Sequence, residues 1–278
     1  MKLYISCDME GTAGVSSWKQ CDPSDPYEYP TYRRYMTREV RAAIEGAREA
    51  GVGEVLVNDS HWNMSNLVWS DLPDDDGLRV ISGTGKPWSM GQGLDESFAA
   101  AFFTGYHAQA GDAATLSHTF SPETLYAVSV NGTPCSEALL VAGLAGSFGV
   151  PVALISGDRT TVEAATRAMP WAVGVTVKDA IGFSAINSLT PQAAQDAIRA
   201  GACEAVKRID RAKPFLFDPP LELLIETVKV ENAEFIELMP GFERIGGRAV
   251  RFRSGDYRRL LRAFVAAVRL GAAANDVA

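Results

Sequence analysis

Apolar positions in the first part of the chain form short continuous runs separated by a segment of helical spacing. Residues 3–7 and 54–58 are apolar runs without a helical period, and they predict two buried strands. Between them, residues 37–50 repeat apolar positions at helical spacing, with Thr37 as the candidate N-cap and Gly51 as the stop. Strand, helix and strand in this order predict a βαβ unit with parallel strands.

The same alternation continues to about residue 180. The further predicted strands cover residues 79–82, 102–106, 126–130 and 152–156. The predicted helices cover residues 95–99, 136–148 and 161–169. A proline-rich segment at residues 22–30 predicts a loop. Strands that alternate with helices are typical of an α/β domain built on a parallel sheet.

The pattern changes after residue 180. A long helix is predicted to begin at Pro191, with Thr190 as its N-cap. The later predicted elements are strands at 221–230 and 248–253 and a final helix at 255–270, capped by Ser254. This sequence therefore predicts an α/β fold, with a parallel-sheet domain over residues 1–180 and a second, smaller α+β domain over residues 181–278.

Composition and charge restrict the possible functions. The chain has 278 residues, of which 47% are hydrophobic and 22% charged, and its net charge is −8. This acidic balance predicts no nucleic-acid partner and no binding to anionic lipid. The N-terminal apolar run is too short for a signal peptide, and no window holds the roughly 18 apolar residues of a membrane span, so a cytoplasmic location is expected. The four cysteines form no CxxC pair and are predicted to be free thiols.

Acidic and imidazole side chains follow the predicted strands. Asp8 and Glu10 come directly after the first strand and, being two apart on an extended backbone, point to the same side. His61 follows the second strand and His107 follows the strand that ends at residue 106. Ligands bind beyond the carboxyl ends of parallel strands, and zinc prefers nitrogen and oxygen ligands. These residues, with Glu137 as a possible fifth ligand, predict a metal site.

Each of these residues has a simpler explanation when it is taken alone. Asp8 and Glu10 are compatible with ordinary loop acids, and the first turn of a helix stabilises a carboxylate such as Glu137 without any metal. His107 is compatible with a hydrogen-bonded core histidine. Lys86 is expected to be a solvated surface lysine, with a second electropositive group at the site as the alternative. The repeated placement at strand ends is what favours the metal site.

Other sequence templates are not met. The sequence has no HExxH motif, no GxSxG elbow and no GxGxxG after the first strand, and Val80 stands where a P-loop requires its first glycine. These absences argue against those metalloprotease, serine hydrolase and nucleotide-binding classes.

Motifs along nearly the whole chain resemble the zinc-dependent D-aminopeptidases of the M55 peptidase family. The segments that carry the resemblance are KLYISCDMEGTAG (2–14), EVLVNDSHWNMSNL (54–67), ISGTGKPWSM (81–90), TGYHAQA (104–110), LSHTF (116–120), VNGTPCSEALL (130–140), PVALISGD (151–158) and ELMPG (237–241). All three histidines of the chain fall inside these segments. The loop at residues 15–34 matches no family motif, which leaves its role, including any part at the substrate entrance, open.

The resemblance implies a site, an activity and an assembly. It implies two zinc ions per chain, with Asp8 as the bridging ligand and His118 as the catalytic residue. The implied zinc ligands are Asp8, Glu10, His61, His107 and Glu137. It further implies a Rossmann-like domain with a smaller α+β domain, a small peptide substrate with an N-terminal D-residue, and a ring-stacked homodecamer around a channel. Two alternatives stay open: a metal-dependent amidohydrolase acting on other small amides, and a non-catalytic peptide-binding component of a dipeptide transport system.

Overall fold

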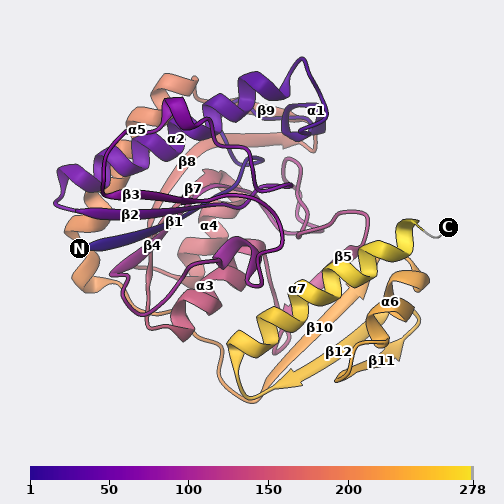
Figure 1. The fold of residues 1–278 in the computed structure, drawn as a ribbon. Coiled ribbons are helices and arrows are strands. Elements are labelled where there is room, and N and C mark those ends of the chain that lie inside the picture. Colours follow the sequence, from indigo (N-terminus) through magenta and orange to yellow (C-terminus); the bar gives the residue numbers. More distant parts are fainter. Residues whose placement is uncertain (277–278) are drawn as a thin grey trace.

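The computed structural model describes residues 1–276, which form a larger sheet with helices on both faces and a smaller sheet beside it (Figure 1). The larger sheet has seven strands in the order β3-β2-β1-β4-β7-β8-β9, and every neighbouring pair is parallel except β8 and β9. Its strands are β1 (Lys2–Cys7), β2 (Glu54–Asp59), β3 (Leu78–Ile81), β4 (Ala100–Tyr106), β7 (Val152–Asp158), β8 (Val173–Gly182) and β9 (Ala185–Ser188). This order confirms the predicted Rossmann-like parallel sheet.

Helices cover both faces of this sheet, which explains why its strands are apolar throughout. Helices α2 (Tyr29–Glu49) and α5 (Pro191–Lys207) lie on one face, and α3 (Glu137–Ser147) and α4 (Arg159–Ala168) on the other (Figure 1). The short helix α1 (Trp18–Cys21) lies near the N-terminal end of α2. Along β1, Leu3 and Ile5 belong to the core under α2 and α5, whereas Tyr4 belongs to the core on the opposite face.

The smaller sheet is antiparallel and carries two helices. Its strands have the order β11-β12-β10-β5-β6. Their bounds are β5 (Leu125–Val130), β6 (Thr133–Pro134), β10 (Leu221–Thr227), β11 (Phe242–Gly246) and β12 (Ala249–Ser254), and the helices are α6 (Val230–Glu237) and α7 (Tyr257–Ala273). The Tyr257 hydroxyl of α7 donates to the carbonyl of Leu140 in α3 at 2.9 Å, so the two parts of the molecule share one core.

The two sheets use the chain in an interleaved way. The β5–β6 hairpin lies within the predicted first domain but pairs with β10 of the smaller sheet. Strand β9 and helix α5 follow residue 180, yet they complete the larger sheet and one of its helical layers. The domain boundary near residue 180 stays a prediction. Each sheet contains strands from both sides of that residue. Across residues 1–276, none of the helices has both the length and the apolar character needed to cross a bilayer.

The predicted start of the first long helix is wrong. Helix α2 begins at Tyr29, so it takes in the end of the segment that was predicted to be a loop. Pro30 lies in the first turn of this helix, where its missing N–H costs nothing. Thr37, expected as the N-cap, is buried within the helix, and its hydroxyl donates to the carbonyl of Arg33 at 2.7 Å.

Two other elements also differ from prediction. No helix forms at residues 95–99, because the Asp95 side chain accepts from the backbone of Ser97 and turns the chain into β4. The last helix is capped by Asp256, which accepts from the backbone N–H of Arg258, while Ser254 ends β12. By contrast, α5 has the predicted Thr190 cap, which accepts from the backbone of Ala193.

Candidate metal centre

Three neighbouring strands of the larger sheet deliver side chains to one edge. Strands β2, β1 and β4 are adjacent, parallel and in register, so their carboxyl ends lie together. Asp8 follows β1, His61 follows β2 by two residues and His107 follows β4 directly. Glu137 is the first residue of α3, whose N-cap Ser136 accepts from the backbone of Leu139. The strand-end placement that the sequence predicts is therefore the arrangement of the structure.

Glycines allow the backbones at this edge to approach one another. The N–H of Gly11 donates to the carbonyl of Gly105 at 2.8 Å, and a Cβ on Gly11 would lie 1.9 Å from the carbonyl oxygen of Tyr106. Gly105 has φ +69°, and a Cβ there would lie 2.1 Å from the carbonyl oxygen of Asp8. The turn after β1 can therefore lie against the end of β4 only because both positions lack a side chain.

Asp8 lies between the two strand-end histidines. Its Oδ1 is 3.2 Å from His61 Nδ1, and its Oδ2 is 3.4 Å from His107 Nε2. Glu10 Oε2 lies 3.0 Å from His61 Nδ1, and Glu137 Oε2 lies 3.4 Å from His107 Nε2. The two oxygens of Asp8 thus point to two separate groups, one with Glu10 and His61 and one with His107 and Glu137.

Backbone carbonyls fix the orientation of all three histidine rings. His61 Nε2 lies 2.8 Å from the carbonyl oxygen of Cys21, His107 Nδ1 lies 2.9 Å from that of Ala108, and His118 Nδ1 lies 2.8 Å from that of Leu116. A ring nitrogen that donates to a carbonyl leaves the other nitrogen with its lone pair. In its neutral form each histidine therefore presents a lone pair to the cluster, which is the arrangement that metal-binding histidines use.

His118 packs beside this cluster rather than between its carboxylates. Its ring stacks on His107 with centroids 4.1 Å apart, and its Nε2 lies 3.9 Å from Glu137 Oε1, which itself accepts from the backbone of Phe120 at 2.5 Å. Trp18 packs edge-on against His118, with ring centroids 5.2 Å apart. Burial and the neighbouring His107 lower the pKa of His118, which favours the neutral ring.

The cluster holds more buried carboxylate than its hydrogen bonds can balance. Burial alone would raise the pKa of Asp8, but the His107 and His61 rings hold it well below its usual range. Burial alone would lower the pKa of His61 and His107, but the carboxylates, Glu10 and Glu137 foremost, raise both well above the usual value. The buried atoms Asp8 Oδ2, Glu10 Oε2 and His107 Nε2 have no hydrogen-bond partner among the described residues. These buried atoms carry lone pairs without a hydrogen-bond partner, which fits a bound cation.

Three overlapping sets of ligand atoms meet here, and within each set the atoms lie within 4.8 Å of one another. The sets are Asp8 with Glu10 and His107, His107 with His118 and Glu137, and Glu10 with Cys21 and His61. The donor types and their burial fit zinc. Cys21 is the one member that the sequence did not single out, because nothing in its spacing places it near His61.

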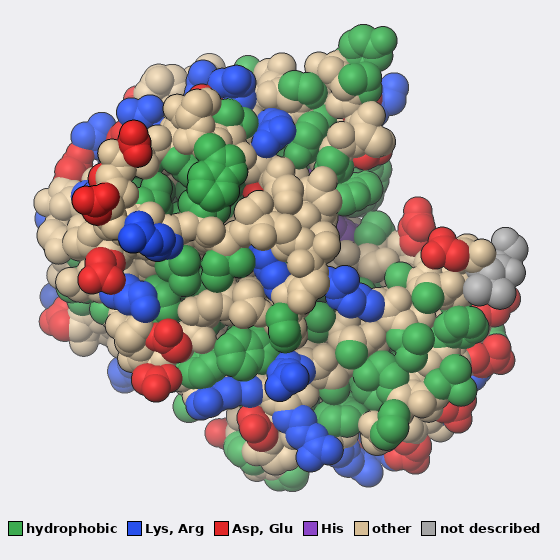
Figure 2. Space-filling view, in the orientation of Figure 1, with side chains coloured by type: hydrophobic (Ala, Val, Ile, Leu, Met, Phe, Trp, Pro, Cys, Tyr) green, Lys and Arg blue, Asp and Glu red, His purple; other side chains and the backbone are tan. Residues whose placement is uncertain are grey.

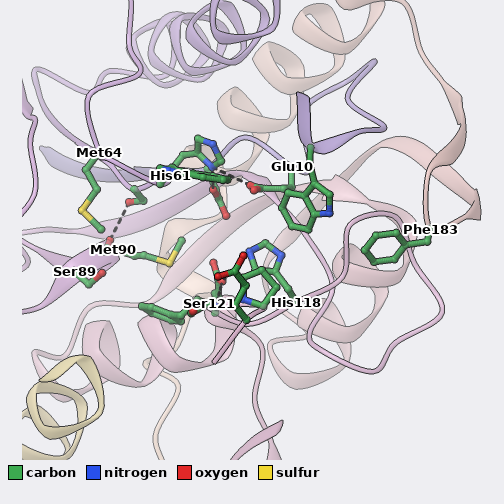
Figure 3. Close-up of a pocket in the computed structure, with 16 residues that line it drawn as sticks. Glu10, His61, Met64, Ser89, Met90, His118, Ser121 and Phe183 are labelled. Atoms are coloured by element: carbon green, nitrogen blue, oxygen red, sulfur yellow. Dashed lines mark hydrogen bonds and ion pairs between the residues drawn. The ribbon is translucent and has the colours of Figure 1, made fainter. Parts of the chain in front are cut away.

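The cluster forms the floor of a cavity of about 700 Å³. Figure 2 shows a histidine at the base of the hollow between the two parts of the molecule. In the close-up, Glu10 and His61 lie across the cavity from His118, with Phe183 on one side and Met64 and Met90 on the other (Figure 3). Trp18, from the loop of unknown role, lines the wall beside His118. The walls are thus mainly aromatic and thioether groups.

Buried lysines support the site from outside the cavity. Lys86 was expected to be a solvated surface residue, which is wrong: it is buried, and its Nζ donates to Asn58 Oδ1 at 2.8 Å and to the carbonyl of Asp59 at 2.6 Å. It therefore holds the end of β2, two residues before His61. Burial lowers its pKa to about 8.

Sequence reasoning missed Lys178 and Glu39, which hold the turn after β1. Lys178 Nζ donates to the carbonyls of Glu10, Thr12 and Val15, and Glu39 accepts from the backbone of Ala13 at 2.8 Å. Burial raises the pKa of Glu39 to about 7. A usable signal existed for Glu39, because the apolar spacing of α2 places it on the buried face of the helix. Lys178 gives no such signal, because it falls on the strand face opposite Val175 and Val177.

A Rossmann-like sheet with a buried carboxylate–histidine cluster at its strand ends is an arrangement that suits a metal-dependent hydrolase. The profile of the M55 peptidases, described as D-aminopeptidase, matches residues 1–266. A D-aminopeptidase of Bacillus subtilis (strain 168) is 37% identical over 260 residues, covering 92% of each chain. The chain therefore belongs to the M55 family of D-aminopeptidases, as the motifs predicted.

A solved structure agrees in fold. The zinc-dependent D-aminopeptidase DppA from Bacillus subtilis, described as a self-compartmentalizing protease, superimposes with a TM-score of 0.93 at 34% identity, covering 98% of each chain. The predicted fold class, with its parallel-sheet core and second antiparallel sheet, is thus confirmed.

Proposed function

We propose that this chain is a zinc-dependent aminopeptidase that hydrolyses short peptides with an N-terminal D-residue. The observation that carries the proposal is the pair of ligand groups that share Asp8 at the floor of the cavity. The names of the similar proteins support zinc and the D-residue. Neither the amidohydrolase nor the transport-component alternative is favoured by any of these similarities.

The proposed ligands are Asp8, Glu10, His61, His107 and Glu137, with Asp8 as the bridge. Zinc held by these residues would supply a Lewis acid for the scissile carbonyl and a source of nucleophilic water near neutral pH. His118 is the proposed catalytic residue, because its Nδ1 is engaged by Leu116 and its Nε2 can take up and return a proton beside Glu137. Trp18 packs edge-on against this ring and helps to hold it in place.

Chirality at the first residue of the substrate is the decisive test of this function. When the amine and the scissile carbonyl are fixed at the floor, inverting the α-carbon directs the side chain to a different wall of the cavity. We expect kcat/KM for D-Ala peptides and amides to exceed that of their L counterparts by at least about tenfold. The measurement is hydrolysis of matched D and L substrates with and without chelator. Equal or faster cleavage of the L series would favour the amidohydrolase alternative.

We propose two zinc ions per chain. Two ligand groups that share one carboxylate are the usual design of a two-metal site, whose ions lie about 3.5–4 Å apart. Elemental analysis of protein saturated with zinc and freed of excess metal is expected to give about two ions per chain. One zinc ion per chain at saturation would contradict the two-metal site, and Asp8 would then be an ordinary ligand of a single ion.

We propose that the chain assembles as a decamer in the cytoplasm, with its sites facing a secluded channel. Support comes from the self-compartmentalizing relative and from Ile181 and Phe183, large apolar side chains that are exposed around the tip of the β8–β9 hairpin. Light scattering is expected to give a mass about ten times that of the 29.8 kDa chain. A monomer at micromolar concentration would contradict the assembly, and cell fractionation tests the location.

A further inference from the structure

Cys21 brings a thiol to the metal centre from the short helix α1. Its side chain is fully buried, and its Sγ lies within 4.8 Å of a carboxylate oxygen of Glu10 and a ring nitrogen of His61. The thiols of Cys7 and Cys135 donate to backbone carbonyls, whereas that of Cys21 has no hydrogen-bond partner among the described residues. The Cys21 sulfur therefore packs in the core beside two metal-type ligands and has no polar partner of its own within residues 1–276.

A second observation at the same place concerns Glu10. Its Oε2 is buried and has no hydrogen-bond partner among the residues that the structure describes. The atom that it faces is His61 Nδ1 at 3.0 Å, which carries a lone pair when the ring is neutral, so the two atoms fit a cation shared between them. The backbone there is well fixed, because the carbonyl of Cys21 accepts from His61 Nε2 and the Gln20 side chain accepts from the backbone of Ser16 and Ser17. The thiol is thus held near the lone pair of Glu10.

We infer that Cys21 supplies a thiolate ligand to the metal ion held by Glu10, His61 and Asp8. This inference rests on the proposed zinc site. Thiolate is a favoured zinc ligand, and on binding the thiol proton passes to solvent while sulfur donates its electron pair to the metal. Without a metal, burial and the nearby Glu10 carboxylate raise the pKa of the Cys21 thiol, and Lys178 opposes them only in part. The charge of the bound cation is therefore what would stabilise the thiolate.

The two metal positions then differ in chemistry. The position beside Cys21 contains sulfur, nitrogen and oxygen, whereas the position beside Glu137 contains only the imidazole of His107 and the carboxylates of Glu137 and Asp8. Soft thiolate ligands select zinc and similar ions over manganese and magnesium. The first position is therefore the one that selects for soft metals.

Cobalt substitution tests the inference directly. Zinc-free protein titrated with Co²⁺ is expected to show the near-ultraviolet sulfur-to-cobalt charge-transfer band, and Cys21→Ala is expected to lack it. Cys203→Ser, which changes a half-buried thiol of α5, is the matched control and should keep the band. If cobalt binds without giving the band, or if the band persists in Cys21→Ala, Cys21 is not a ligand. The proposed metal centre itself would not be affected by either result. Protein that binds no cobalt or zinc overturns the proposed metal centre as well.

The metal preference of Cys21→Ala distinguishes a thiol that binds the metal from a thiol that only fills space in the core. Cys21→Ala keeps the backbone carbonyl that orients His61, so only the sulfur is lost. We expect its affinity for Cd²⁺ at this position, measured by chelator competition, to fall at least about tenfold, and its affinity for Mn²⁺ to fall much less. An equal fall for both ions, or none for Cd²⁺, would show that the sulfur only fills space and would overturn the inference.

Discussion

His118→Ala is expected to keep its zinc and its fold while turnover falls by roughly 100- to 10,000-fold, the usual contribution of a positioned acid–base group. The physical reason is the place of the ring: it stacks on His107 at the side of the cluster, and its Nε2 is 3.9 Å from Glu137 Oε1, outside the two groups that share Asp8. The measurements are kcat and bound zinc on the same preparation.

His107→Ala is the comparison that gives this result its meaning. His107 Nε2 faces both Asp8 and Glu137, so its loss removes a ligand and leaves two buried carboxylates without a partner. We expect zinc content to fall by about one ion per chain and turnover to fall at least as far as in His118→Ala. If His118→Ala also loses zinc, His118 is a ligand, and Glu137 becomes the first assignment to reconsider. Full activity in His118→Ala would make that ring structural.

Gly11→Ala is expected to destabilise the protein by about 4 kcal/mol or more, because the new Cβ would lie 1.9 Å from the Tyr106 carbonyl oxygen, in contact with backbone that has no room to move. Relief of this clash must push the turn after β1 away from β4, and with it Glu10 away from His61. Zinc affinity should therefore fall together with stability. Denaturant unfolding of the zinc-free and zinc-loaded variant measures both effects.

Gly53→Ala is the matched control for this substitution. A Cβ at Gly53 meets no atom within 4 Å, and its stability should change by less than about 1 kcal/mol. A Gly11→Ala protein that is as stable and as rich in zinc as the control would show that the approach of β1 to β4 is not what holds the site together.

The parallel sheet and the strand-end site could be predicted because local pattern determines both. Continuous apolar runs identify strands buried on both faces, and the residues that follow such runs must meet at one edge of the sheet. The resemblance to the M55 family added expected roles for individual residues, such as Asp8 as the bridging ligand and His118 as the catalytic residue. The ligand assignments themselves stay predictions until metal binding is measured.

Contacts between distant segments could not be predicted in the same way. Lys178 donates to three carbonyls that are more than 160 residues away in the sequence. Lys86 is brought to the end of β2 by a turn, and the periodic pattern of apolar residues does not predict the path of that turn. The start of α2 was missed because prolines were taken as signs of a loop, although Pro30 fits a first helical turn. Pairing of β5 with β10 depends on the long connection between them.

The acceptors that orient the three histidine rings are the main-chain oxygens of Cys21, Ala108 and Leu116. Every amino acid carries such an oxygen, so no point substitution at these positions deletes the contact. The three side chains can therefore change without disturbing the direction of the imidazoles. The orientation is vulnerable instead to changes in the path of the chain, and short deletions or insertions next to these residues are the mutations that lineages of this protein should be least able to tolerate.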